Sequence, residues 1–131
     1  MELKFYKCPT CGNVIVKLVD SGITPSCCGK TMVELTPNTV EASEEKHLPV
    51  IERTDECTIR VSVGSEPHPQ VKEHHISLIA IIAGDCLQVK WLKVDNGKPT
   101  AEFRCKCKVD AAYALCNLHG LWLTKKEDCK L

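Results

Sequence analysis

Apolar and polar residues alternate over short distances along most of the second half of the chain. Five segments are rich in β-branched and aromatic residues, and clusters of turn-forming residues such as GSEPHP and DNGKP separate them. The segments are residues 47–53, 57–64, 75–84, 87–94 and 101–110. Several short strands with turns at this spacing predict an antiparallel β-sandwich.

The first 36 residues have a different pattern. Their only strand-like apolar run lies between Val14 and Val19, and glycine and proline interrupt the rest. Such a segment buries too little surface to fold without a staple. We therefore predict a mostly β protein with a small metal module at residues 1–36, a linker and the start of an active-site loop at 37–46, and an immunoglobulin-like sandwich domain at 47–131.

Charge and composition narrow the classes of function. The 17 basic residues balance the 17 acidic ones, and no basic, aromatic-rich stripe is present, which argues against nucleic acid as a partner. No apolar run approaches the roughly 20 residues of a membrane span, and the N-terminus lacks a signal-peptide core. We expect a soluble, cytoplasmic protein, in which ten cysteines favour metal ligands or redox thiols over a disulfide scaffold.

A first set of metal ligands is predicted within residues 8–28. Cys8 and Cys11 form a CPTCG knuckle, and Cys27 and Cys28 follow after fifteen intervening residues. Four thiolates suit a tetrahedral zinc or iron site. Neighbouring side chains on a strand point to opposite faces, so both later sulfurs reach one metal only if the backbone bends sharply, which Gly29 permits. The alternative is a structural staple without chemistry, and the choice between zinc and iron stays open.

A second set of candidate ligands combines histidines with one cysteine. Prolines flank one histidine, at PHP, and make its loop stiff. Cys116 and His119 are three residues apart, a spacing that would place both on one face of a helical turn ended by Gly120. A mixed imidazole and thiolate set suits iron, copper or zinc. The candidates are His47, His68, His74, Cys116 and His119.

Both motifs resemble a known family. CxxC followed by an adjacent CC resembles the N-terminal iron module of desulforedoxin and desulfoferrodoxin, and EKH, PHP, His74 and CNLHG resemble the signature of the superoxide reductase domain. Together the resemblance covers nearly the whole chain. It implies two irons per chain: one held by Cys8, Cys11, Cys27 and Cys28, and one held by His47, His68, His74 and His119 with Cys116 as the axial thiolate.

The resemblance also implies a reaction and partners. Superoxide would be reduced by one electron to hydrogen peroxide, with no oxygen produced, and a rubredoxin-like protein would donate the electron. Lys46 would attract the superoxide anion and support protonation, and Glu45 would bind the ferric iron. A homodimer is expected, because the small module forms part of a dimer interface in the family.

Some features depart from this picture or compete with it. His75 directly follows His74, but the spacing from His68 favours His74 as the ligand. Phe103, Cys105, Cys107 and Val109 alternate with charged residues, so we expect them on the buried face of a strand. An exposed thiol is expected at Cys129. The rival hypotheses are a zinc- or iron-binding interaction module without superoxide turnover and an electron carrier with saturated irons.

Overall fold

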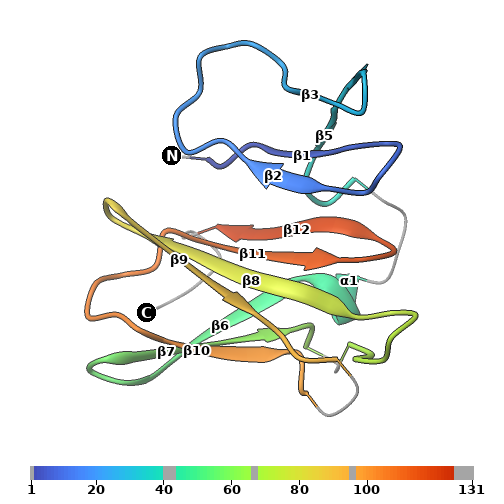
Figure 1. Cartoon of the computed structure of the whole chain (residues 1–131). Helices are drawn as coiled ribbons and strands as arrows, with labels where there is room; N and C mark the ends of the chain where they lie inside the picture. The colour runs from blue at the N-terminus through green and yellow to red at the C-terminus, as the bar shows by residue number, and fades with distance from the viewer. Residues whose placement is uncertain (1, 40–43, 66–67, 95–96, 126–131) are drawn as a thin grey trace. The chain divides into compact units, whose positions relative to one another are not determined.

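The computed structural model describes residues 2–39, 44–65, 68–94 and 97–125, with the side chains of Glu44 and Glu45 left aside (Figure 1). Contacts between residues divide the chain into two compact units, Met1–Thr36 and Pro37–Leu131. Each unit is described by itself. Within the described residues, no helix has the length and apolarity that a membrane-crossing helix needs.

The first unit contains two small antiparallel sheets. Three strands form the larger one in the order β2-β1-β5: β1 Phe5–Lys7, β2 Val14–Val16 and β5 Val33–Leu35. A short hairpin joins β3 Ser26–Cys27 to β4 Lys30–Thr31. The core cluster is small: it contains Tyr6, Cys8 and Met32, with Cys27 packed against them. Two of the four candidate metal ligands of this unit are therefore part of its hydrophobic core.

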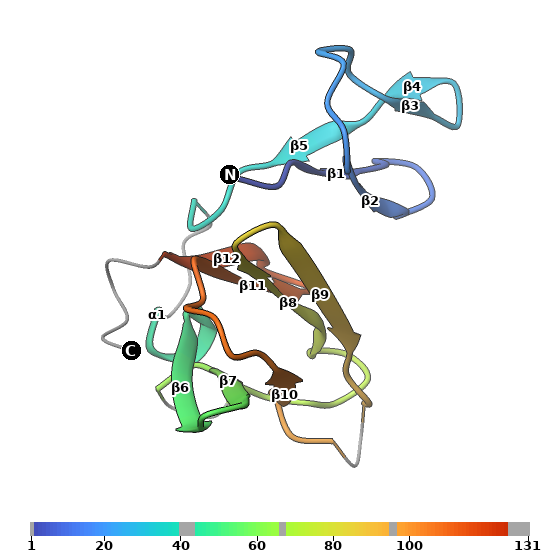
Figure 2. The same cartoon turned by 90° about the vertical axis from the view of Figure 1, so that its left-hand side faces the viewer.

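The second unit is a sandwich of two antiparallel sheets, as the sequence predicted (Figure 2). One sheet has the order β10-β7-β6 and the other β12-β11-β8-β9. The strands are β6 Pro49–Asp55, β7 Thr58–Val63, β8 Ile76–Ala83, β9 Cys86–Trp91, β10 Thr100–Arg104, β11 Ala111–Cys116 and β12 Gly120–Lys125. A four-residue helix, α1 Glu44–His47, precedes β6.

The core of this unit lies between the two sheets. Alternate residues of facing strands fill it, for example Ile59 and Val61 of β7 opposite Ala112 and Ala114 of β11. The same alternation brings Cys116, 2% exposed, into the core at the last position of β11. The position of Cys116 in β11 therefore determines that its side chain, a predicted metal ligand, points into the core.

Two local predictions were wrong. Cys116 and His119 do not share a helical turn: Cys116 ends β11, pairs with Gly120 of β12, and three loop residues connect them. Gly120 has a φ of 76°, as expected after a three-residue hairpin loop. Cys107 is exposed, because β10 ends at Arg104 and the following residues leave the sheet.

The predicted linker begins as part of the second unit. The side chain of Asn38 donates to the carbonyl oxygen of Leu123 at 3.0 Å and accepts from its N–H at 2.9 Å. The N–H of Asn38 also donates to the carbonyl oxygen of Leu121 at 3.0 Å. These bonds fasten the chain to β12 shortly before α1, and so help to position the helix that carries His47.

Candidate metal centres

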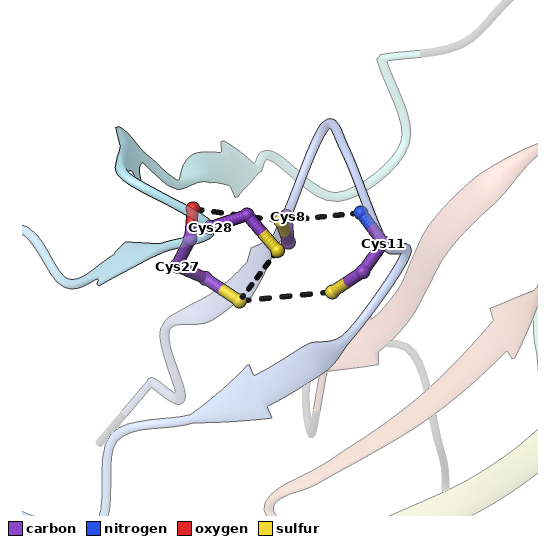
Figure 3. A group of neighbouring side chains, drawn as sticks. All are labelled: Cys8, Cys11, Cys27 and Cys28. Atoms are coloured by element: carbon purple, nitrogen blue, oxygen red, sulfur yellow. Dashed lines mark hydrogen bonds between the residues drawn. The ribbon is translucent and has the colours of Figure 1, made fainter.

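The first cluster consists of Cys8, Cys11, Cys27 and Cys28, whose sulfur atoms all lie within 4.8 Å of one another (Figure 3). The Sγ atoms of Cys11 and Cys27 are 3.6 Å apart, and those of Cys27 and Cys28 are 3.9 Å apart. All four are free thiols. Four convergent sulfurs form the donor set of a tetrahedral zinc or iron site.

The knuckle after β1 directs backbone donors at one sulfur. The N–H groups of Thr10 and Cys11 both point to Cys8 Sγ, with N···S distances of 3.4 Å. The N–H of Gly12 closes the turn on the carbonyl oxygen of Cys8 at 3.1 Å, and Gly12 has a φ of 82°. These donors stabilise a thiolate at Cys8.

The β3–β4 turn explains how adjacent cysteines join one cluster. Cys27 pairs with Lys30, so Cys28 and Gly29 are the two residues of the hairpin loop. Their φ values of 54° and 71° are both positive, the backbone of a type I′ turn. The sharp bend expected from the sequence is therefore confirmed, and Cys28 itself adopts the left-handed conformation that makes it possible.

Electrostatics within the cluster favour a bound cation. The N–H of Cys11, assisted by that of Thr10, lowers the pKa of the Cys8 thiol to about 6. Contacts with Cys11, Cys27 and Cys8 raise the pKa of Cys28 to about 12. The Cys8 thiol therefore ionises readily, whereas ionisation of Cys28 is unfavourable unless a positive charge lies nearby. A metal ion supplies that charge.

The second cluster is a ring of four imidazoles. Neighbouring ring centroids are 4.5–4.9 Å apart, and neighbouring planes are inclined by 78–86°. His47 and His74 face each other across the ring, with centroids 6.1 Å apart. The order around the ring is His47, His68, His74, His119.

Three separate elements deliver these side chains. His47 is the last residue of α1, and His119 lies in the β11–β12 loop. His68 and His74 come from the segment between β7 and β8, where Val71 and His74 form an isolated bridge that closes the loop. The side chain of Gln70 fastens this segment to Ile76, because it donates to the Ile76 carbonyl oxygen at 2.9 Å and accepts from the Ile76 N–H at 2.8 Å.

Cys116 approaches the imidazole ring from the core. Its Sγ lies 3.5 Å from His68 Nε2 and 3.9 Å from His119 Nδ1. The N–H of His119 points back to the same sulfur at 3.4 Å. Burial raises the pKa of the Cys116 thiol, although the backbone N–H groups of His119 and Leu118 oppose this effect. A cation beside the sulfur would favour the thiolate.

His68 is oriented by its own loop. Its Nδ1 lies 2.6 Å from the carbonyl oxygen of Pro69, which only accepts, so Nδ1 carries the hydrogen and Nε2 is left with its lone pair. The atoms of His47, His74, Cys116 and His119 lie within 4.8 Å of one another, and His68 is outside this compact set. It nevertheless contacts both His47 and His74 in the ring.

Two of the histidines bind each other, because His47 Nε2 and His119 Nδ1 lie 3.0 Å apart, but a third leaves a ring nitrogen without a partner among the described residues. Within the described part of the chain, His74 Nε2 is buried and has no hydrogen-bond partner. Burial, and then the nearby histidines, lower the pKa of His74, and burial lowers that of His68 to about 4. Both imidazoles are therefore neutral at pH 7, with nitrogens available as ligands. A metal would satisfy the nitrogen that the protein leaves unpaired.

Comparisons with known proteins agree with this geometry. The sequence profile described as desulfoferrodoxin matches residues 39–125. A desulfoferrodoxin of Syntrophotalea carbinolica is 41% identical over 121 residues, which is 92% of this chain and 94% of that protein. A desulfoferrodoxin homolog of Archaeoglobus fulgidus is 40% identical over the same shares.

The chain belongs to the desulfoferrodoxin family. The crystal structure of the superoxide reductase from Treponema pallidum is similar to this chain, with a TM-score of 0.79 and 32% identity. The similarity covers 95% of this chain and all of that one. It therefore includes both units.

Of the remaining candidates, the structure describes the side chains of Lys46 and His75. Lys46, next to His47, is exposed, and its charge is among those that lower the pKa of His74, after burial and the nearby histidines. The side chain of Glu45 and all of Cys129 are outside the described residues. His75 turns away, because its Nδ1 faces the carbonyl oxygens of Val71 and Lys72, each at 3.1 Å.

Sequence reasoning missed two residues that support the second cluster. Trp122 is buried, and its Nε1–H donates to the carbonyl oxygen of His119 at 3.1 Å. Asn117 binds both neighbours of His74: its side chain accepts from the N–H of His75 at 2.8 Å and donates to the carbonyl oxygen of Glu73 at 3.0 Å. The only sequence signal was proximity to His119, three residues from Trp122 and two from Asn117.

Proposed function

We propose that this desulfoferrodoxin is a superoxide reductase, which reduces superoxide by one electron to hydrogen peroxide and produces no oxygen. The observation that carries the proposal is the ring of four imidazoles beside one buried thiol. An electron carrier with saturated metals needs no such mixed donor set next to an exposed lysine. The family and the likeness to a superoxide reductase support the same activity.

The second cluster is proposed as the active site. His47, His68, His74 and His119 would hold iron through ring nitrogens, and Cys116 would bind from the core side. Ferrous iron in this set would supply the electron that superoxide receives. Burial keeps the imidazoles of His68 and His74 neutral, and two backbone N–H groups point at the sulfur of Cys116, so both ligand types are prepared in the fold.

Lys46 is proposed to guide the substrate. Its side chain is exposed beside His47, and a cation there attracts an anion and holds a water that can donate a proton. Glu45 precedes it in α1, and we propose that its carboxylate binds the metal after the electron has left. This step would help to expel peroxide.

The first cluster is proposed as a second iron site. Cys8, Cys11, Cys27 and Cys28 would hold one iron in a desulforedoxin-like module of residues 1–36, which brings the total to two irons per chain. The reductase domain would span residues 47–131, after the linker at 37–46. The iron of the first cluster would stabilise the module or relay electrons, because the module has little apolar core of its own.

Partners and location complete the proposal. A rubredoxin-like protein would supply electrons, and the chain would act as a homodimer in the cytoplasm. The free thiols of all described cysteines suit a reducing compartment. Cell fractionation and the molar mass in solution test these points.

Metal content and superoxide turnover test the function together. Protein purified without oxygen is analysed for metals per chain, and superoxide is then delivered as a pulse while the visible spectrum is recorded. Two irons, rapid loss of superoxide and one peroxide for each superoxide consumed are expected. A Cys116→Ser variant should lose the turnover, while a Cys86→Ser variant, at an exposed cysteine outside both clusters, should retain it. Zinc in the first cluster, together with a second cluster that binds no iron when iron is added without oxygen, would favour an interaction module without superoxide turnover.

A further inference from the structure

Four cysteines outside both metal centres gather at one end of the sandwich. Cys57 lies in the β6–β7 turn, Cys86 begins β9 after the β8–β9 turn, and Cys105 and Cys107 follow β10. In Figure 1 these turns lie at the left of the sandwich, whereas α1 and the β11–β12 loop lie at its right. The four thiols and the histidine cluster therefore lie at opposite ends of the sandwich.

Two of the four are cross-strand neighbours. The antiparallel register of β10 and β7 pairs Arg104 with Thr58, so the next pair in the ladder is Cys105 with Cys57. The N–H of Cys105 donates to the carbonyl oxygen of Cys57 at 2.8 Å, which continues the ladder by that one pair. Residues directly opposite in a hydrogen-bonded pair have Cα atoms about 5.5 Å apart.

Both side chains are on the same face of the sheet. Side chains alternate along a strand, and Phe103 and Ile59, two residues from the cysteines, both lie in the core. Cys105 is 9% exposed and belongs to the same core cluster, while Cys57 is half-buried at its edge. A disulfide needs Cα atoms about 4.4–6.8 Å apart and side chains that face each other, and the cross-strand register and shared face of this pair favour both conditions. In the reduced form the Cys105 thiol donates to the carbonyl oxygen of Cys107 at 3.2 Å.

Arg53 holds the two strand ends together. Its guanidinium donates to the carbonyl oxygen of Cys105 at 2.9 Å and to that of Cys107 at 2.7 Å. It also donates to the carbonyl oxygens of Asp55 and Glu56, each at 3.2 Å, in the turn that carries Cys57. The pair is thus fixed in register at the position where the ladder ends.

Exposed thiols lie beside the pair. Cys86 and Cys107 are both exposed and free. The carboxylate of Asp85 raises the pKa of the Cys86 thiol, and charge on Cys107 and Cys105 adds to this effect. The start of β9 lies close to the end of β10, because the side chain of Gln88 in β9 donates to the carbonyl oxygen of Arg104 at 2.9 Å.

We propose that Cys57 and Cys105 form a reversible dithiol–disulfide site that hydrogen peroxide oxidises. The sulfur of the more accessible Cys57 attacks peroxide, so that an S–O bond forms, the O–O bond breaks and one water leaves. The sulfur of Cys105 then attacks the sulfur of Cys57, an S–S bond forms, the S–O bond breaks and a second water leaves. The two thiols lose two electrons and two protons, and one peroxide becomes two waters.

The inference rests on the proposed function only for the source of the oxidant, because hydrogen peroxide is the product of superoxide reduction. The geometry of the pair is independent of that activity. The fraction of protein with the disulfide would then report how much peroxide the same chain has formed. The disulfide would also join β7 and β10, two strands of one sheet, covalently.

The experiment uses reagent hydrogen peroxide on the iron-loaded protein. Reduced protein is treated with equimolar peroxide without oxygen, free thiols are alkylated, and the digested peptides are sequenced by mass spectrometry. A peptide pair joined through Cys57 and Cys105 is expected, and dithiothreitol should separate it. Thiols of the iron-binding cysteines are mapped in the same digest, so damage to a metal centre is recognised.

Matched variants separate this pair from its neighbours. Cys57→Ser should abolish the linked peptides and leave Cys105 free to react with the alkylating reagent, whereas Cys86→Ser should form the link like the wild type. The oxidised wild type should unfold at a higher temperature than the reduced form, and Cys57→Ser should show no such shift. No linkage at Cys57, or a link between Cys107 and Cys86 in its place, would overturn the proposal. A link in protein that does not consume superoxide would support the site and refute only the proposed function.

Discussion

The indole ring of Trp122 stacks on the imidazole of His47, with ring centroids 4.8 Å apart and planes inclined by 26°. The same indole donates to the backbone of His119. One buried side chain of β12 therefore supports two histidines that come from distant parts of the sequence. A substitution of Trp122 should lower the affinity for the metal more than it lowers the stability of the fold.

Trp122→Phe should retain much of the stacking but lose the hydrogen bond to His119. Loss of an outer hydrogen bond of this kind lowers metal affinity by about 10- to 100-fold. Competition with a chelator, followed through the visible band of the second iron, measures the effect. Trp122→Leu removes the aromatic ring as well and should release iron faster still. Equal iron release from wild type and both variants would show that the indole does not support the site.

Asn117→Ala should loosen the loop that carries His74, because Glu73 and His75 would both lose their side-chain partner. The N–H of His75 is partly buried, and leaving it unpaired costs about 1–3 kcal/mol in the free energy of unfolding, whereas the carbonyl oxygen of Glu73 is exposed and can bind water instead. Urea unfolding of the metal-free chain gives this value. Asn117→Asp is the control, since it retains the acceptor for His75 and loses only the donor to Glu73, and a smaller loss is expected. A larger loss for the aspartate variant would contradict the assignment of the two bonds.

Lys46→Ala should slow the bimolecular reaction with superoxide by up to about tenfold and weaken its dependence on salt, because one attracting charge is removed. Pulsed superoxide at several ionic strengths provides both readouts. Lys106→Ala, which removes an exposed lysine from the opposite end of the sandwich, is the matched control and should behave like the wild type. Unchanged kinetics in Lys46→Ala would exclude it from guiding the substrate.

Acid should loosen the loop between the two cysteine pairs of the first centre. Lys17, the N–H of Gly22 and Lys4 hold the pKa of Asp20 well below its ordinary value of 3.8. The unfolded chain therefore takes up a proton at this position before the folded chain does, and the contribution of Asp20 to stability is lost as the pH falls below that ordinary value.

Asp20→Asn provides the comparison for this prediction. It should lower the thermal midpoint of the first unit at neutral pH, and the difference from the wild type should shrink as the solution is acidified. A difference that stays constant with pH would mean that the charge of Asp20 contributes nothing. Gly22 amide exchange, followed by NMR, locates the change in the loop.

Ligand candidates were easier to predict than the backbone that carries them. Spacing alone nominated Cys27 and Cys28 and required a bend between them, and the turn at Cys28 and Gly29 supplies it. The β-sandwich was also predictable, because alternating apolar residues mark its strands. The sequence pattern did not distinguish a helical turn from a hairpin loop at Cys116 and His119, since a three-residue spacing suits both.

Contacts between distant segments could not be predicted from local pattern. Cys107 continues the alternation of β10 but is exposed, because the sheet ends at Arg104 where no partner strand remains. The local pattern does not single out Trp122, because its contact with His47 depends on how α1 meets β12. The cross-strand pairing of Cys57 and Cys105 depends in the same way on strand register, which neither segment shows by itself.

The two centres differ in how much of the chain must exist before they can form. The sulfurs of the first centre all lie between Cys8 and Cys28, so this site can bind its metal while the rest of the protein is still being synthesised. The second needs residues from His47 to His119, and its loops meet only when both sheets have closed on each other. The sulfurs of the first site are all present once residue 28 has been synthesised, whereas the ligands of the second are complete only after residue 119, so the chain offers its two donor sets in that order.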